Sequence, residues 1–88
     1  MISAEQIHAI AAKIDSAGVS ETTVSGLRQA YQPIHFTYCM DDDLPNNTPV
    51  FEHKGFNLYL IDGREHCLCL TNDYDAATGI VVAEVIED

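Results

Sequence analysis

The sequence predicts an α+β fold in which an N-terminal helical hairpin packs on an antiparallel β-sheet of three to four strands. Up to about residue 31, apolar residues recur at three- and four-residue spacing, which is the period of an amphipathic helix. From about residue 34, apolar and polar residues alternate between turn signals, which is typical of strands in a sheet. A chain of 88 residues has room for one such domain, spanning residues 1–88.

The first helix is expected over about residues 3–17. Ser3 is a favourable N-cap, and Gln6 three residues later completes a capping box. Gly18 stands where a left-handed residue commonly ends a helix. The apolar stripe of this helix consists of Ile7, Ile10, Ala11 and Ile14.

The second helix is expected over about residues 20–31. Ser20 is its N-cap, and Pro33 ends the helix because the residue before a proline disfavours helical geometry. Gly26 lies inside this helix, where glycine costs roughly 1 kcal/mol relative to alanine. We therefore expect Gly26 to permit close contact with the first helix.

Strands are expected over about residues 34–40, 56–61, 66–71 and 80–86. Asp62-Gly63 is a strong signal for a two-residue turn, which would join the second and third of these strands as a hairpin. The last segment is assigned to a strand because Ile80-Val81-Val82 is β-branched, which helices tolerate poorly. The polar segment 41–49 is expected to be a loop.

The charge balance is strongly acidic, with fourteen Asp and Glu against four Lys and Arg and a net charge of −10. Binding to nucleic acids or to anionic membranes depends on Lys and Arg that neutralise phosphate, so both partner classes are excluded. An acidic domain suits a protein partner with a basic surface, a cation, or solubility alone.

The sequence gives no sign of export or membrane insertion. The N-terminus has neither a basic region nor an apolar run typical of a signal peptide, and no apolar run approaches the roughly 18 residues that span a bilayer. Three cysteines are an odd number, which does not suggest a secreted disulfide framework. We expect a cytoplasmic protein with reduced thiols.

Strand alternation singles out one candidate metal site. His35 and Cys39 share one face of their strand, and Cys67 and Cys69 share one face of theirs. If the two strands are neighbours, an imidazole and three thiols gather on one surface, as zinc or an iron–sulfur cluster requires. Against this, residues two apart on a strand lie roughly 6–7 Å from each other, and there is no Cys-x-x-Cys motif. The alternative is that the cysteines are small buried residues beneath the helices.

The acidic run Asp41-Asp42-Asp43 is a candidate for contact with a partner. It lacks the interior glycine and closing glutamate of a calcium-binding loop. It is therefore either a solvated loop or an electrostatic contact for a basic protein surface. Tyr59, on the less apolar face of its strand, is the aromatic residue expected at such an interface.

Several short runs resemble a family of short, uncharacterised bacterial proteins encoded near nitrogen-fixation genes in proteobacteria. The likeness spans nearly the whole chain and rests on Ile2-Ser3-Ala4-Glu5-Gln6, His35-Phe36-Thr37-Tyr38-Cys39, Asp41-Asp42-Asp43, Gly55-Phe56-Asn57-Leu58-Tyr59-Leu60, Gly63-Arg64-Glu65-His66-Cys67 and Ala77-Thr78-Gly79. The resemblance implies an accessory role around nitrogenase, its maturation or its electron supply. It brings no catalytic residues.

No nucleophile elbow and no glycine-rich phosphate loop occurs in the chain, so no catalytic residues are predicted. The sequence favours a non-catalytic acidic accessory protein that binds a protein partner, without a cofactor. The alternative is a small carrier that binds zinc or an iron–sulfur cluster through His35, Cys39, Cys67 and Cys69.

Overall fold

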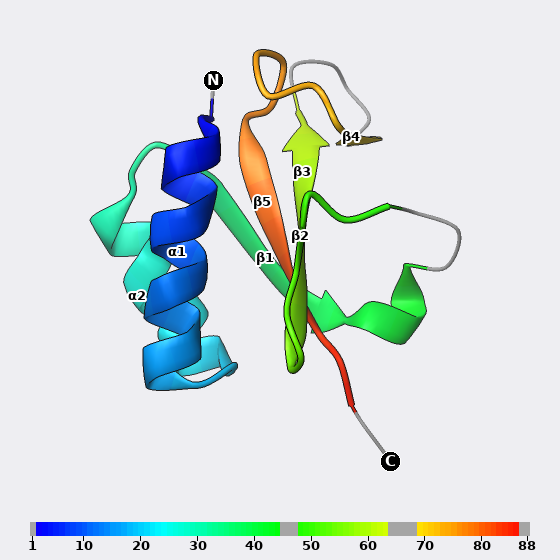
Figure 1. The fold of residues 1–88 in the computed structure, drawn as a ribbon. Helices are drawn as coiled ribbons and strands as arrows, with labels where there is room; N and C mark the ends of the chain where they lie inside the picture. The colour runs from blue at the N-terminus through cyan, green and yellow to red at the C-terminus, as the bar shows by residue number, and fades with distance from the viewer. Residues whose placement is uncertain (1, 45–47, 64–68, 87–88) are drawn as a thin grey trace.

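The computed structural model describes residues 2–44, 48–63 and 69–86, and it shows two helices followed by a mixed five-stranded sheet (Figure 1). Both helices lie on one face of the sheet, which confirms the α+β class (Figure 1). In chain order the elements are α1 (Ala4–Ala17), α2 (Glu21–Ala30), β1 (His35–Met40), the 3₁₀ turn η1 (Asp41–Asp43), β2 (Phe51–Glu52), β3 (Phe56–Asp62), β4 (Cys69–Thr71) and β5 (Gly79–Glu84).

Helix α1 begins and ends at the residues that its sequence indicates. The Ser3 hydroxyl accepts the Gln6 N–H at 3.1 Å, and the Gln6 side chain accepts the Ser3 N–H at 2.9 Å, which completes the capping box. Gly18 ends the helix at φ 92° and donates its N–H to the Ile14 carbonyl at 2.7 Å. A side chain at this φ would be strained, which is why glycine is suited to the position.

Helix α2 is also capped as predicted, because the Ser20 hydroxyl accepts the Thr23 N–H at 3.2 Å. The expectation for Gly26 is wrong, however. Gly26 is exposed, and a Cβ built on it would have no heavy atom within 4 Å. Val24 and Leu27 instead occupy the buried face of α2, and Gly26 lies in an open groove that residues of α1 and α2 line.

The sheet differs from the expected antiparallel one in its strand order and direction. Its order is β1-β5-β3-β2, and β4 pairs with the remaining length of β3. β1 runs parallel to β5, whereas β3 is antiparallel to β5, β2 and β4. The prediction of a wholly antiparallel sheet is therefore wrong. The alternation of apolar and polar residues predicts which face of the sheet a side chain occupies. It does not predict which strands are neighbours or whether they are parallel.

β5 is the central strand, although it is the last in the chain. Ile80 and Val82 face the helices, while Val81 and Ala83 face the opposite side, and all of them are buried. Burial on both faces explains the continuous apolar run in this segment. The strand ends at Glu84, two residues before the predicted end.

Gly79 lets β5 approach β1 closely. A Cβ on Gly79 would lie 2.8 Å from the carbonyl oxygen of His35, its partner in the parallel register. Any larger residue would therefore force the two strands apart at this point.

The hairpin between β3 and β4 exists, but its register is not the predicted one. Ile61 pairs with Leu70 and Asp62 with Cys69, which leaves residues 63–68 between the strands. A two-residue Asp62-Gly63 turn would instead have paired Ile61 with Arg64, so that prediction is wrong. Of the predicted strand 66–71, residues 66–68 lie outside the described residues, and 69–71 form β4.

One hydrophobic cluster lies on each face of the sheet. The main core lies between the helices and the sheet and contains Ile2, Ile7, Ile10, Ala11, Ile14, Val24, Leu27, Phe36, Phe56, Leu58, Leu60, Ala77, Ile80 and Val82. The second core lies on the opposite face of the sheet and contains Tyr59, Ile61, Val81 and Ala83, with Cys39, Leu44 and Leu70 packed against it. The second core is smaller, and three of the candidate residues from the sequence, Cys39, Asp41 and Tyr59, lie in it or beside it.

Candidate functional site: an acidic turn held by the second core

The acidic turn, defined as Asp41–Asp43, follows directly from the end of β1. It was expected to be an irregular loop, but it forms one turn of 3₁₀ helix, in which the Leu44 N–H donates to the Asp41 carbonyl at 3.0 Å. Leu44, the next residue, packs against the second core. The turn is therefore attached to the sheet at both of its ends.

The first carboxylate of the acidic turn is a structural group. Oδ1 of Asp41 accepts a hydrogen bond from the Tyr59 hydroxyl at 2.8 Å and another from the Asn57 side-chain amide at 3.0 Å. Asn57 and Tyr59 lie two residues apart on β3 and hence on one face of the sheet. In the register of the sheet, Ala83 lies between Cys39 and Asn57, and its small side chain leaves room for the contact.

Asp42 and Asp43 are exposed, while Asp41 is half-buried. The bonds to Asp41 tie the backbone of the turn to the sheet, and the second and third carboxylates point into solvent from this anchored backbone. A turn whose backbone is already ordered loses less conformational entropy when its charges pair with a partner than a flexible loop does.

Tyr59 does not lie at the surface, where the sequence placed a contact residue. Only 3% of the residue is exposed, and it belongs to the second core. Burial and the hydrogen bond to Asp41 raise the pKa of Tyr59 to about 12. Its contribution is to hold the acidic turn, so a partner would meet Asp42 and Asp43 rather than Tyr59.

Cys39 lies beside this site in a half-buried position against the second core. Burial raises the pKa of the Cys39 thiol, and the nearby carboxylates of Asp43 and Asp41 raise it further. The reactive and metal-binding form of cysteine is the thiolate. The surroundings of Cys39 disfavour that form.

The strands that carry the predicted metal ligands are not neighbours, because β5 and β3 lie between β1 and β4. His35 and Cys39 are about 13 Å apart along β1, and Cys69 lies three strand spacings, about 14 Å, from β1. Leu70 packs on the second core, so the adjacent Cys69 points to the opposite face from Cys39.

The structure therefore separates His35, Cys39 and Cys69, and Cys67 lies outside the described residues. Within residues 2–44, 48–63 and 69–86, no three His, Cys, Asp or Glu side chains are grouped as metal ligands. The alternative that the cysteines are buried beneath the helices also does not hold for the two described ones, since Cys39 lies on the other face and Cys69 is exposed.

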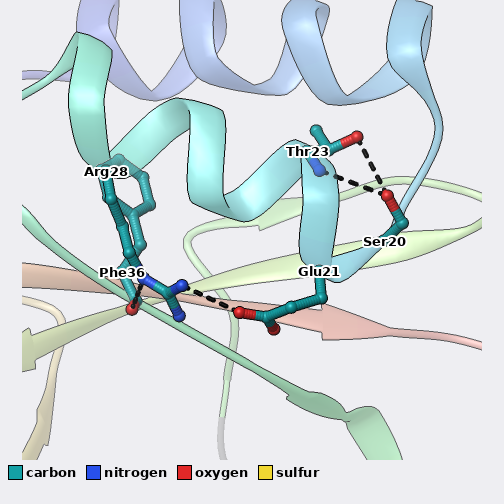
Figure 2. Close-up of polar contacts among 5 residues, drawn as sticks. All are labelled: Ser20, Glu21, Thr23, Arg28 and Phe36. Atoms are coloured by element: carbon teal, nitrogen blue, oxygen red, sulfur yellow. Dashed lines mark hydrogen bonds and ion pairs between the residues drawn. The ribbon is translucent and has the colours of Figure 1, made fainter.

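A second polar feature, which the sequence reasoning missed, lies along the outer edge of β1. Arg28 of α2 donates from Nε to the Phe36 carbonyl at 3.1 Å and from a terminal nitrogen to the Glu21 carboxylate at 2.8 Å (Figure 2). Their spacing of seven residues places Glu21 and Arg28 on one helix face, which is the signal that could have revealed the pair. Asn57 was also missed, although it shares a strand face with Tyr59.

A groove of about 850 Å³ lies beside the N-terminal half of β1. It is lined by Arg28, Gln32, Pro33, Ile34, His35, Phe36, Thr37, Ile61, Gly63 and Thr78. The groove is separate from the acidic turn and lies at the other end of the strand.

No helix in the described part of the chain is long and apolar enough to cross a membrane.

No curated protein and no solved structure is significantly similar to the chain. The model of a family of unknown function, DUF6129, matches residues 9–85. The matched residues run from within α1 to just beyond the end of β5, so they include nearly the whole fold. The chain therefore belongs to DUF6129, a family whose function is unknown.

Proposed function

We propose that this protein is a non-catalytic acidic accessory protein, which binds a basic surface of a protein partner through Asp42 and Asp43. The observation that carries the proposal is the anchoring of Asp41 by Tyr59 and Asn57. It fixes the acidic turn against the sheet and leaves the next two carboxylates exposed.

The charge of the whole chain supports the same mode of binding. A net charge of −10 creates a negative field that attracts a basic partner and accelerates encounter, and salt weakens this attraction. Cys39 and Tyr59, two potential nucleophiles beside the turn, both have raised pKa values, so their reactive deprotonated forms are disfavoured. This argues for binding rather than catalysis.

The biological setting of the proposal comes from the sequence resemblance to bacterial proteins encoded near nitrogen-fixation genes. On that basis we place the protein in the cytoplasm of a nitrogen-fixing bacterium, beside nitrogenase or the proteins that mature it or supply its electrons. The iron–sulfur or zinc carrier is not retained as a second proposal, because no described residue group favours it.

The test is capture of partners from a lysate of a nitrogen-fixing bacterium, with identification by mass spectrometry. The wild-type protein is compared with the double variant Asp42→Asn/Asp43→Asn at low and at moderate salt. A matched control, Glu5→Gln/Glu52→Gln, removes two other exposed carboxylates and so has the same net charge as the first variant.

We expect a basic partner that is captured by the wild type and by the control, lost with Asp42→Asn/Asp43→Asn, and released at moderate salt. Equal capture by all three proteins would contradict the proposal. Equal loss in both variants would show that net charge alone attracts the partner, which also contradicts a role for the acidic turn.

A further inference from the structure

β1 is an edge strand with a free side. It pairs with β5 on one side, and no strand in the described part of the chain pairs with the other. Its residues are His35–Met40, which makes it longer than β2 (Phe51–Glu52) and β4 (Cys69–Thr71), the short strands along the opposite edge. Proteins commonly blunt exposed edges with very short strands, and β1 is not blunted in this way.

The backbone groups on the free side of β1 follow from its register. The His35 N–H donates to the Thr78 carbonyl, so His35, Thr37 and Cys39 direct their backbone groups toward β5. The residues between them direct their N–H and C=O groups outward. Arg28 bonds to the outward carbonyl of Phe36, which agrees with this assignment.

The Glu21–Arg28 pair protects only the N-terminal half of this edge (Figure 2). It occupies one backbone acceptor, the Phe36 carbonyl. Further along β1, the outward N–H and C=O groups of Tyr38 and the outward N–H of Met40 have no partner strand in the described residues, whereas the Met40 carbonyl caps the 3₁₀ turn that follows. The side chains of Arg28 and Glu21 are 43% and 62% exposed, and an ion pair so exposed contributes little and is easily displaced.

The free half of the edge leads directly into negative charge. Asp42 and Asp43 follow Met40 within three residues, and both are exposed. Glu84, at the end of the neighbouring strand, pairs with Met40 in the register and accepts the Tyr38 hydroxyl. An added strand at this edge therefore meets carboxylates at the C-terminal end of β1.

We infer that the outer edge of β1 binds an extended, basic segment of a partner protein, which adds to the sheet as a further strand. The inference rests on the proposed function and specifies how the partner is held. Backbone hydrogen bonds to Tyr38 and Met40 fix the segment, and its Lys or Arg side chains pair with Asp42 and Asp43. A second copy of this chain fits the edge poorly, because two chains of −10 repel each other.

The test uses a synthetic peptide of alternating valine and lysine as the probe and isothermal titration calorimetry with the full chain. Two further peptides serve as controls. One has N-methyl groups on alternate backbone nitrogens, which prevents strand pairing, and the other has glutamate in place of lysine.

Met40→Pro is the matched protein variant for the edge. Its N–H points outward, so the substitution removes a donor from the free edge and none from the ladder with β5. Met40 has φ −88°, which lies near the range of proline. Circular dichroism and urea unfolding are used to check that the Met40→Pro variant is folded. Asp42→Asn/Asp43→Asn is the matched variant for charge.

We expect the lysine peptide to bind, and its amide contacts to shift the NMR signals of Tyr38 and Met40. Binding should weaken about tenfold with Met40→Pro, which removes one strand-pairing hydrogen bond, and more than tenfold with the N-methylated peptide, which removes several. Suppose that the N-methylated peptide binds as well as the lysine peptide, that Met40→Pro binds as well as the wild type, and that Asp42→Asn/Asp43→Asn abolishes binding. Strand addition is then overturned and the proposed function stands. If Asp42→Asn/Asp43→Asn also binds as well as the wild type, strand addition and the proposed function are both overturned. Concentration-dependent dimerisation through Tyr38 and Met40 would likewise overturn the inference.

Discussion

The Tyr59 hydroxyl donates a hydrogen bond of 2.8 Å to Asp41, and so a buried residue of the third strand holds the residue that follows the first strand. β5 lies between these two strands, and the bond therefore crosses the full width of one strand. This contact makes the position of the acidic turn depend on the packing of the second core.

Replacing Tyr59 with phenylalanine should destabilise the protein without creating a cavity. Oδ1 of Asp41 would keep only its bond from Asn57, and a hydrogen bond to a charged acceptor contributes about 1.5–3 kcal/mol. Urea unfolding measures the change in free energy. Tyr74→Phe is the control, because the half-buried Tyr74 makes no side-chain hydrogen bond to another residue that the structure describes. Equal stability of Tyr59→Phe and the wild type would show that the bond contributes nothing net.

Alkaline pH should weaken the hydrogen bond between Tyr59 and Asp41 and so destabilise the protein. The pKa of Tyr59 is raised in the folded state, from about 10 to about 12. Its contribution is therefore fully present below about pH 10 and is lost as the pH rises toward about 12. The difference between these two pKa values corresponds to about 3 kcal/mol. Between about pH 9.5 and 12, the wild type should lose more stability than Tyr59→Phe, and parallel curves for the two proteins would disprove this.

Gly26→Ala should stabilise the protein by about 0.5–1 kcal/mol. The added methyl group meets no atom within 4 Å, and alanine has the higher helix propensity. Thermal unfolding measures the gain. Gly18→Ala is an informative comparison with the opposite expected sign, because its φ of 92° strains any side chain. A destabilised Gly26→Ala protein would mean that this face of α2 is covered by something.

Gly79→Ala should destabilise the protein by about 1–3 kcal/mol, since the new Cβ would lie 2.8 Å from the His35 carbonyl oxygen. Backbone cannot move aside there without weakening the pairing of β1 with β5. Hydrogen exchange of the β1 and β5 amides should rise more than that of the helices. Unchanged exchange in these two strands would contradict a close approach at Gly79.

The features that the sequence predicts well are local ones. Ser3, Gln6 and Gly18 act within one turn of their own positions, so their pattern is sufficient to place the ends of α1. The β-branched run at residues 80–82 likewise indicates a strand that is buried on both faces, which the structure shows. The parallel pairing of β1 with β5 joins segments more than forty residues apart, and no local pattern encodes it.

The candidate site shows the same division. The exposure of Asp42 and Asp43 follows from a run of charge, as the sequence indicates. The anchoring of Asp41 could not be predicted, because it depends on which strand separates β1 from β3. The metal hypothesis also depended on the strand order. It assumed that β1 and β4 are neighbours, but β5 and β3 lie between them.

The central place of β5 has a consequence for the order in which the molecule can form. A ribosome releases the helices and β1 first, but the strand that pairs with β1 spans Gly79–Glu84 and is synthesised last. Until that strand emerges, the edge of β1 that faces β5 stays unpaired, and the apolar surface of α1 and α2 lacks its contact with Ile80 and Val82. A nascent chain that stalls before residue 79 thus exposes what chaperones and proteases recognise, and completion of β5 is the step that ends this exposure.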